Sequence, residues 1–146
     1  MKKRRIALLL SSLALFPIVA LAEEQSTELT VEIPSEYTLT IPATTKDIKH
    51  NQELTELGSL KEQGNLAIDQ KVKVTATKIP LKYNAQSIPF SLKDEQNAEW
   101  TQGFWTEAEA NSGKEIPLKV NITSEDWAKA KAGKYQGKII FTSSFE

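Results

Sequence analysis

The chain has 146 residues, of which 40% are apolar and 25% are charged, and its formal net charge is −1. This length and balance are typical of one folded domain, which argues against a multidomain enzyme and against a disordered chain. The chain contains no cysteine, so disulfides and thiolate-based catalytic or metal sites are excluded. Composition therefore indicates a class of protein and leaves its function open.

The first 22 residues are predicted to be a secretory signal peptide. A basic run at 2–5 precedes an uncharged, mostly apolar run of 16 residues at 6–21, and Ala20 and Ala22 form a typical small-residue cleavage pattern. An uncleaved membrane anchor is the alternative, but this run is shorter than the roughly 20 residues that span a bilayer. We therefore expect a secreted, extracellular or cell-wall-associated protein, with no membrane span after cleavage and one domain over 23–146.

Removal of this leader changes the charge of the protein. The leader holds four of the 18 basic residues and none of the 19 acidic residues, so residues 23–146 carry a formal charge of −5. A mildly acidic domain without a basic stripe lacks the electrostatic signature of a protein that binds nucleic acid or anionic lipid. We therefore expect no nucleic-acid partner.

Alternation of apolar and polar residues predicts short β-strands along most of the chain after the leader. The alternating runs are 27–33, 36–42, 71–77, 118–123 and 135–145, and shorter apolar segments lie at 79–83, 88–92 and 100–105. Pro34 and Ser35 interrupt the first two runs, which form two strands or one kinked strand. Residues 44–57 mix β-branched and polar side chains, and we expect a long connection there.

One segment, 124–133, has the pattern of a short helix. Ser124 or Thr123 can cap its start, acidic residues follow in the first turn, lysines occupy later positions and Gly133 can end it. We expect this helix to lie between the last two strands, with Trp127 facing the core.

Three stretches resemble a known group of proteins. They are LTVEIPSEYTLTIPA at 29–43, GNL at 64–66 followed by KVKVT at 71–75, and WAKAKAGKYQGKIIF at 127–141. Their strand and turn patterns resemble small secreted immunoglobulin-like modules of Gram-positive bacterial cell-surface proteins, over most of residues 23–146 and most weakly between 78 and 115. The resemblance implies an immunoglobulin-like fold, an extracellular or wall-associated location and an adhesin-like role.

The strand pattern and the resemblance lead to one fold prediction. About seven or eight strands in the 124 residues after the leader match the count and spacing of an antiparallel β-sandwich. We predict an all-β, immunoglobulin-like antiparallel β-sandwich of about seven or eight strands, with one short helix before the last strand.

Residues that could support catalysis are few. His50 is the only histidine, and its place in the polar connection favours a solvated side chain over a member of a Ser-His-Asp triad. Acidic pairs such as Asp94-Glu95 and Glu125-Asp126 are dispersed among lysines and lack calcium-loop spacing, so we interpret them as solvated surface. Zinc-ligand clusters and glycine-rich phosphate loops are also absent from the sequence. We expect no catalytic residues, no metal, no cofactor and no enzymatic activity.

A group of aromatic residues suggests a binding site. Trp100, Phe104 and Trp105 lie in the polar stretch 94–114, where exposed flat rings could form a platform for a sugar or a peptide. The alternative is that one or both tryptophans pack in the core, since tryptophan is highly buried on average.

Three functions remain as hypotheses. The first is a non-enzymatic, secreted or cell-surface-associated binding module that holds an extracellular protein or glycan partner. The second is a pilus-like structural subunit that assembles by β-strand addition, with self-association through residues 27–33, because this run alternates as a donor strand should. The third is a small extracellular hydrolase that uses paired carboxylates.

Overall fold

The computed structural model describes residues 26–42 and 45–146. The chain divides into two units, Met1–Glu32 and Ile33–Glu146, and each is described by itself. The predicted signal peptide lies outside the described residues. In the first unit, residues 26–32 are exposed and have no regular secondary structure, so the strand predicted over 27–33 is absent there.

The second unit is an all-β fold, as predicted from the alternating sequence. Its described residues form eight strands: β1 (Glu36–Thr40), β2 (Leu54–Asn65), β3 (Lys71–Tyr83), β4 (Gln86–Ile88), β5 (Ser91–Lys93), β6 (Gln102–Thr106), β7 (Glu115–Asn121) and β8 (Gln136–Phe145). The same residues form two short helices, α1 (Glu107–Ser112) and α2 (Ser124–Lys129).

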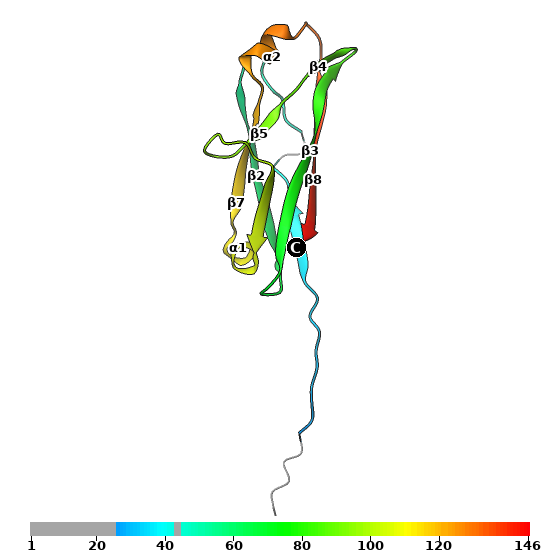
Figure 1. The fold of residues 1–146 in the computed structure, drawn as a ribbon, viewed down its shortest axis with the longest axis vertical. Helices are drawn as coiled ribbons and strands as arrows, with labels where there is room; N and C mark the ends of the chain where they lie inside the picture. The colour runs from blue at the N-terminus through cyan, green and yellow to red at the C-terminus, as the bar shows by residue number, and fades with distance from the viewer. Residues whose placement is uncertain (1–25, 43–44) are drawn as a thin grey trace, which may run out of the picture. The chain divides into compact units, whose positions relative to one another are not determined.

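The strands form two antiparallel sheets that make a sandwich (Figure 1). The first sheet has the order β1-β2-β7-β5. In the second sheet, β4 and β6 pair with opposite ends of β3, and β8 pairs with most of its length. Residues 72–75 of β3 pair with both β6 and β8, so these two strands lie on opposite sides of β3.

The core lies between the sheets and follows the period-two pattern of the strands. Its buried apolar side chains are Leu57, Leu60, Leu66, Val72, Val74, Ile88, Leu92, Trp100, Trp105, Ala110, Leu118, Val120 and Ile122. The helix α2 follows β7 and precedes β8, as the sequence predicted. The predicted end at Gly133 is wrong, because α2 ends at Lys129 with Ala130 as its C-cap.

The sequence predicted a long connection over 44–57, and this prediction is wrong at its end. The strand β2 already begins at Leu54, so the last four residues of that range belong to the strand. The inward positions of β2 change parity along the strand: Thr55 and Leu57 are buried before Gly58, and Leu60 and Glu62 after it. Gly58 has a φ of 115° and lies at a register shift against β7. A β-bulge therefore breaks the alternation by which a strand is recognised in a sequence.

The helix α1 was also not predicted, although its sequence carries capping signals. The hydroxyl of Thr106 accepts a hydrogen bond from the Glu109 N–H at 3.3 Å, and the Glu109 carboxylate accepts one from the Thr106 N–H at 2.9 Å. This capping box starts the helix, and Gly113 ends it in a left-handed conformation with a φ of 76°.

Glu62 is an acidic side chain in the core. Its exposed fraction is 0%, and neither carboxylate oxygen makes a well-formed hydrogen bond within the described part of the chain. Burial raises the pKa of this carboxyl to about 7, and the nearby backbone amide of Gln63 offsets this effect only in part. The carboxyl is therefore protonated in the folded protein under mildly acidic conditions, which avoids a buried charge.

This raised pKa predicts that the protein loses stability as the pH rises. Between the unfolded pKa of 4.5 and the folded pKa of about 7, the folded state binds more protons than the unfolded state. The free energy of unfolding should therefore fall by roughly 3 kcal/mol across this window. Urea unfolding at about pH 5 and about pH 8 measures the loss. Glu62→Gln should flatten the profile, whereas Glu36→Gln on the exposed face of β1 should leave it unchanged; equal profiles for Glu62→Gln and the parent protein contradict the assignment.

Candidate functional site

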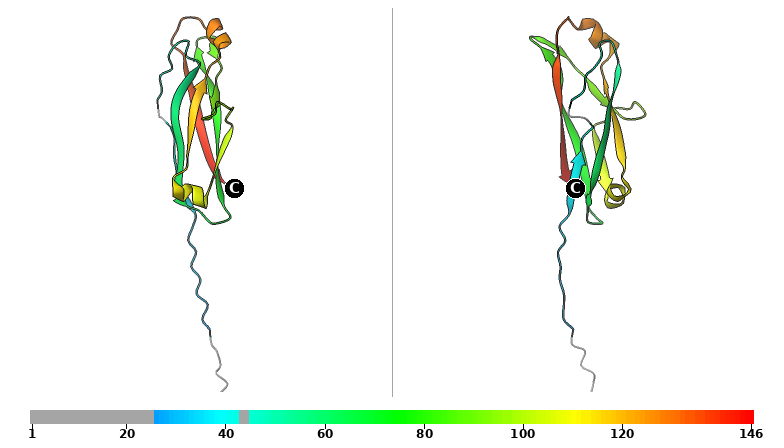
Figure 2. Two further views of the ribbon diagram at one scale, coloured as in Figure 1. Left: turned by 90° about the vertical axis from the view of Figure 1, so that its left-hand side faces the viewer. Right: turned by 180° about the vertical axis from the view of Figure 1, so that it is seen from behind.

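Helix α2 lies at one end of the sandwich (Figure 2). Residues of α2 and of the segments around it line a cleft at this end. Its volume is about 670 Å³. The walls come from the β1–β2 connection, from β3 and β4, and from α2 and the loop that follows it. The lining residues are Lys46, Asp47, Ile48, His50, Leu81, Ile88, Trp127, Ala130, Lys131, Ala132, Gly133, Lys134 and Tyr135.

Trp127 holds one wall of the cleft in place. Thr123 caps α2 by accepting a hydrogen bond from the Asp126 N–H at 3.1 Å, so the next residue, Trp127, lies in a defined first turn. The indole N–H of Trp127 donates to the Gln52 carbonyl at 3.1 Å. The ring of His50 lies edge-to-face on the indole, with centroids 5.4 Å apart. These contacts join α2 to the β1–β2 connection.

Tyr135 fixes another part of the wall. Its hydroxyl donates a hydrogen bond to the Lys131 carbonyl at 3.0 Å and accepts one from the Lys131 N–H at 3.2 Å, which closes the loop 131–135 on itself. Its ring packs against Tyr83, with centroids 5.8 Å apart. Gly133 lies so close to the Tyr83 ring that a Cβ at this position would overlap it. The loop therefore depends on glycine for its close approach to β3.

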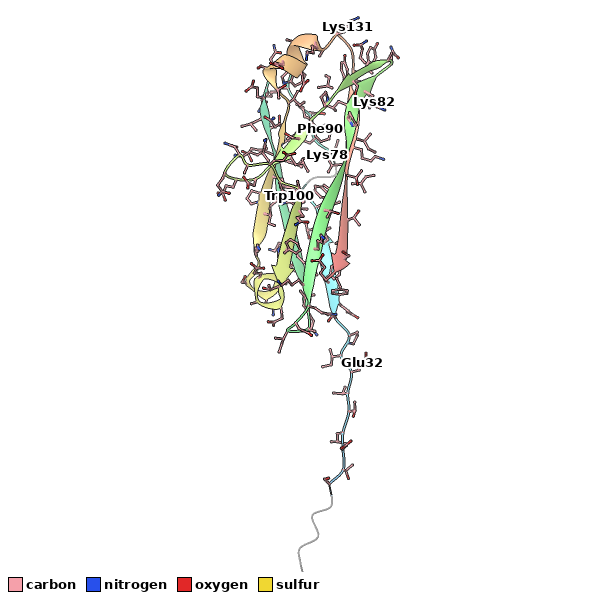
Figure 3. The ribbon with its side chains drawn as sticks, viewed as in Figure 1. Glu32, Lys78, Lys82, Phe90, Trp100 and Lys131 are labelled. Carbon is pink, nitrogen blue, oxygen red and sulfur yellow. The ribbon has the colours of Figure 1, made fainter. Side chains whose placement is uncertain are left out.

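The cleft combines an apolar floor with a positively charged rim. Ile48, Leu81 and Ile88 supply aliphatic surface, and Trp127 and Tyr135 supply half-buried aromatic rings. At the rim are Lys46, Lys131 and Lys134 against a single carboxylate, Asp47. Figure 3 shows Lys131 at the α2 end of the domain. A low-dielectric floor below a rim in which lysines outnumber carboxylates three to one favours an anionic ligand with apolar surface.

The aromatic residues predicted to bind a ligand lie elsewhere. Trp105 is fully buried, and its indole N–H donates to the Lys114 carbonyl at 3.0 Å. Trp100 has an exposed fraction of 7%, lies near the middle of the domain in Figure 3, and packs against Phe141 with centroids 6.3 Å apart. Both tryptophans therefore belong to the core, which was the alternative interpretation of the sequence.

Phe104 is half-buried and differs from the two tryptophans. Together with Trp100 and Lys114 it lines a smaller hollow of about 390 Å³, and the Lys73 Nζ lies 5.9 Å from the centroid of its ring. Of the three rings of the predicted platform, only that of Phe104 is substantially exposed, because Trp100 and Trp105 are buried. Ligand binding by the three residues stays a prediction.

The candidate catalytic residues do not gather into a recognisable centre. Across 26–42 and 45–146, no three His, Asp or Glu side chains are placed to hold a metal ion. His50 lies in the β1–β2 connection against Trp127, in the wall of the cleft.

No helix among the described residues has the length and apolar character needed to cross a membrane.

Comparison of the chain with models of known protein families gave no match, and comparison with curated proteins gave none. The geometry of the cleft and the sequence patterns are therefore the basis for a functional proposal.

Gly133→Ala should destabilise the loop that forms one wall of the cleft. Gly133 does not have a positive φ, so the effect should come from the overlap with Tyr83 rather than from backbone strain. We expect a loss of roughly 1 to 2 kcal/mol in the free energy of unfolding, measured by urea denaturation. Tyr83→Ala should cost less in the Gly133→Ala background than alone, because the overlap is gone. Additive effects of the two substitutions would show that the rings and the loop are not coupled.

Proposed function

We propose that this chain is a non-enzymatic binding module, secreted or associated with the cell surface, and that the cleft at the α2 end holds an acidic glycan. The observation that carries the proposal is the cleft itself, in which three lysines surround half-buried aromatic and aliphatic surface. The basic run and apolar segment at the start of the sequence support export. The strand and turn patterns that resemble Gram-positive surface modules support the same location.

A glycan is the ligand class that the lining favours over a protein. Aromatic rings offer flat surfaces on which the apolar faces of sugar rings can pack, and Trp127 and Tyr135 both line the cleft. Lysine ammonium groups are strongly hydrated point charges, and three of them suit carboxylate, sulfate or phosphate groups repeated along an oligosaccharide. Because residues 23–146 are acidic overall, these lysines form a local exception that attracts anions to this end.

The experiment is a titration followed by tryptophan fluorescence. The chain has three tryptophans, of which Trp100 and Trp105 are buried in the core, so a bound ligand in the cleft should change chiefly the emission of Trp127. The probes are acidic oligosaccharides that carry carboxylate, sulfate or phosphate groups. A galacturonate oligomer and its methyl ester form a matched pair, since they share one sugar backbone and differ in charge.

We expect an acidic member of the panel to bind and its uncharged counterpart to bind much more weakly. Lys131→Gln and Lys134→Gln should each weaken binding roughly two- to fivefold, and added salt should weaken it further. Lys71→Gln is the matched control, because Lys71 is an exposed lysine at the start of β3 that does not line the cleft. Equal binding of charged and uncharged sugars, or no loss in the Lys131 and Lys134 variants, would falsify the assignment. Binding of an oligoglutamate peptide instead would identify a protein partner.

A further inference from the structure

The second sheet has an unpaired edge at β8. Within the described residues, β8 pairs only with β3. From the pair Ile79–Lys138 to the pair Val72–Phe145 the register between the two strands is unbroken. β8 is ten residues long, contains no proline, and Lys138 is its only charged residue. A long edge of this kind can accept a further strand through its backbone groups.

Apolar side chains beside this edge are incompletely covered. Ile139 and Phe141 pack against the core but remain half-exposed, and the ring of Phe145 has an exposed fraction of 42%. Tyr37 of β1 contacts the Phe145 ring edge-to-face at 4.8 Å, so the edge strands of the two sheets approach each other on this side. By contrast, Leu118 on the inner strand β7 is completely buried. One further strand along β8 would therefore cover apolar surface that the sandwich leaves open.

The segment before β1 has the sequence of such a strand. Leu29, Val31 and Ile33 alternate with polar residues, and their exposed fractions are 93%, 82% and 71%. Residues 26–32 have an extended-strand pattern in sequence but no strand partner within the described residues. Three large apolar side chains exposed in alternation match the inward positions of a paired strand, in which they would be removed from water.

We propose that residues 27–33 of one copy add as a strand to the free edge of β8 in a second copy. Leu29, Val31 and Ile33 would then cover the half-exposed Ile139 and Phe141 of that copy. This pairing uses none of the cleft lysines, so it is independent of the glycan-binding proposal.

Length and charge agree with this partner. Seven residues in extended conformation span roughly 23 Å, which fits within the roughly 33 Å of a ten-residue strand. The donor segment carries Glu28 and Glu32, whereas the acceptor strand carries Lys138 and no acidic residue. Donor and acceptor are therefore oppositely charged, and like segments do not attract each other.

The proposed interface predicts that copies add in an open series and do not stop at a closed dimer. A donor segment and an acceptor edge are different surfaces of one chain, so each added copy presents a new donor and a new acceptor. The expected assembly is a linear series whose length increases with protein concentration.

The first test measures the mass of the purified protein by light scattering after size-exclusion chromatography, over a series of concentrations. The parent protein should form dimers and longer species. Val31→Asp should abolish them, because the carboxylate would have to be buried against β8. Thr30→Asp is the matched control, since it adds the same charge to the neighbouring position on the opposite face of the strand and should preserve assembly.

The second test examines the acceptor separately. The Val31→Asp protein keeps an intact β8, so a synthetic peptide of residues 26–35 should bind it and slow hydrogen exchange at β8 amides. The same peptide with Val31→Asp should bind at least about tenfold more weakly.

Three outcomes would overturn the proposal. They are a parent protein that stays monomeric at all concentrations, equal effects of Val31→Asp and Thr30→Asp, and peptide-induced protection at β1 or β5 instead of β8. A monomer whose own residues 27–33 are protected from exchange would show that the segment pairs within its own chain, which also overturns assembly between copies.

Discussion

The pairing of three strands with β3 is the interaction on which the second sheet depends. β4, β6 and β8 each form a ladder with β3, and within the described residues these ladders hold that sheet together. The register of β3 directs Val72 and Val74 into the core, where both are completely buried. Its far end supplies Leu81 to the floor of the cleft, and its long ladder with β8 creates the free edge. Both proposed binding surfaces therefore derive from one strand.

The sequence predicted those elements whose residues carry a single clear pattern, either regular apolar–polar alternation or helix capping. β3, β7 and β8 alternate regularly, and α2 has an N-terminal cap, so their positions overlap the expected segments, although α2 ends before the predicted Gly133. β2 was missed because a bulge at Gly58 changes the parity of its inward positions and because one of these positions is the acidic Glu62. Residues 27–33 were predicted as a strand because the alternation of apolar and polar residues makes a segment compatible with a sheet. A strand also needs a partner with which to pair, and alternation does not show whether one is present.

The candidate site was less predictable, because its walls come from segments far apart in the sequence. Trp127 was recognised as a helical residue that faces inward, but a sequence does not reveal that its indole N–H reaches the carbonyl of Gln52. The prediction at Trp100 and Trp105 relied on their polar neighbours, and the strand β6 places the Trp105 ring in the core instead. Local polarity describes the neighbours in sequence, whereas burial depends on which sheet face a residue occupies.

The proposed acceptor edge of β8 begins beside the cleft, because Lys134 and Tyr135, which line the cleft, immediately precede β8 in the chain. An added strand of seven residues leaves about three residues of β8 uncovered, so it can pair along 138–144, which includes Lys138, without covering the cleft. A linear series would then repeat the same lysine-rimmed cleft along its length. Exposed charges bind single anions weakly, but a polymer that engages several clefts at once gains avidity from their high effective concentration. Weak individual sites and an assembling scaffold would therefore reinforce each other in the proposed binding of a repetitive, acidic glycan.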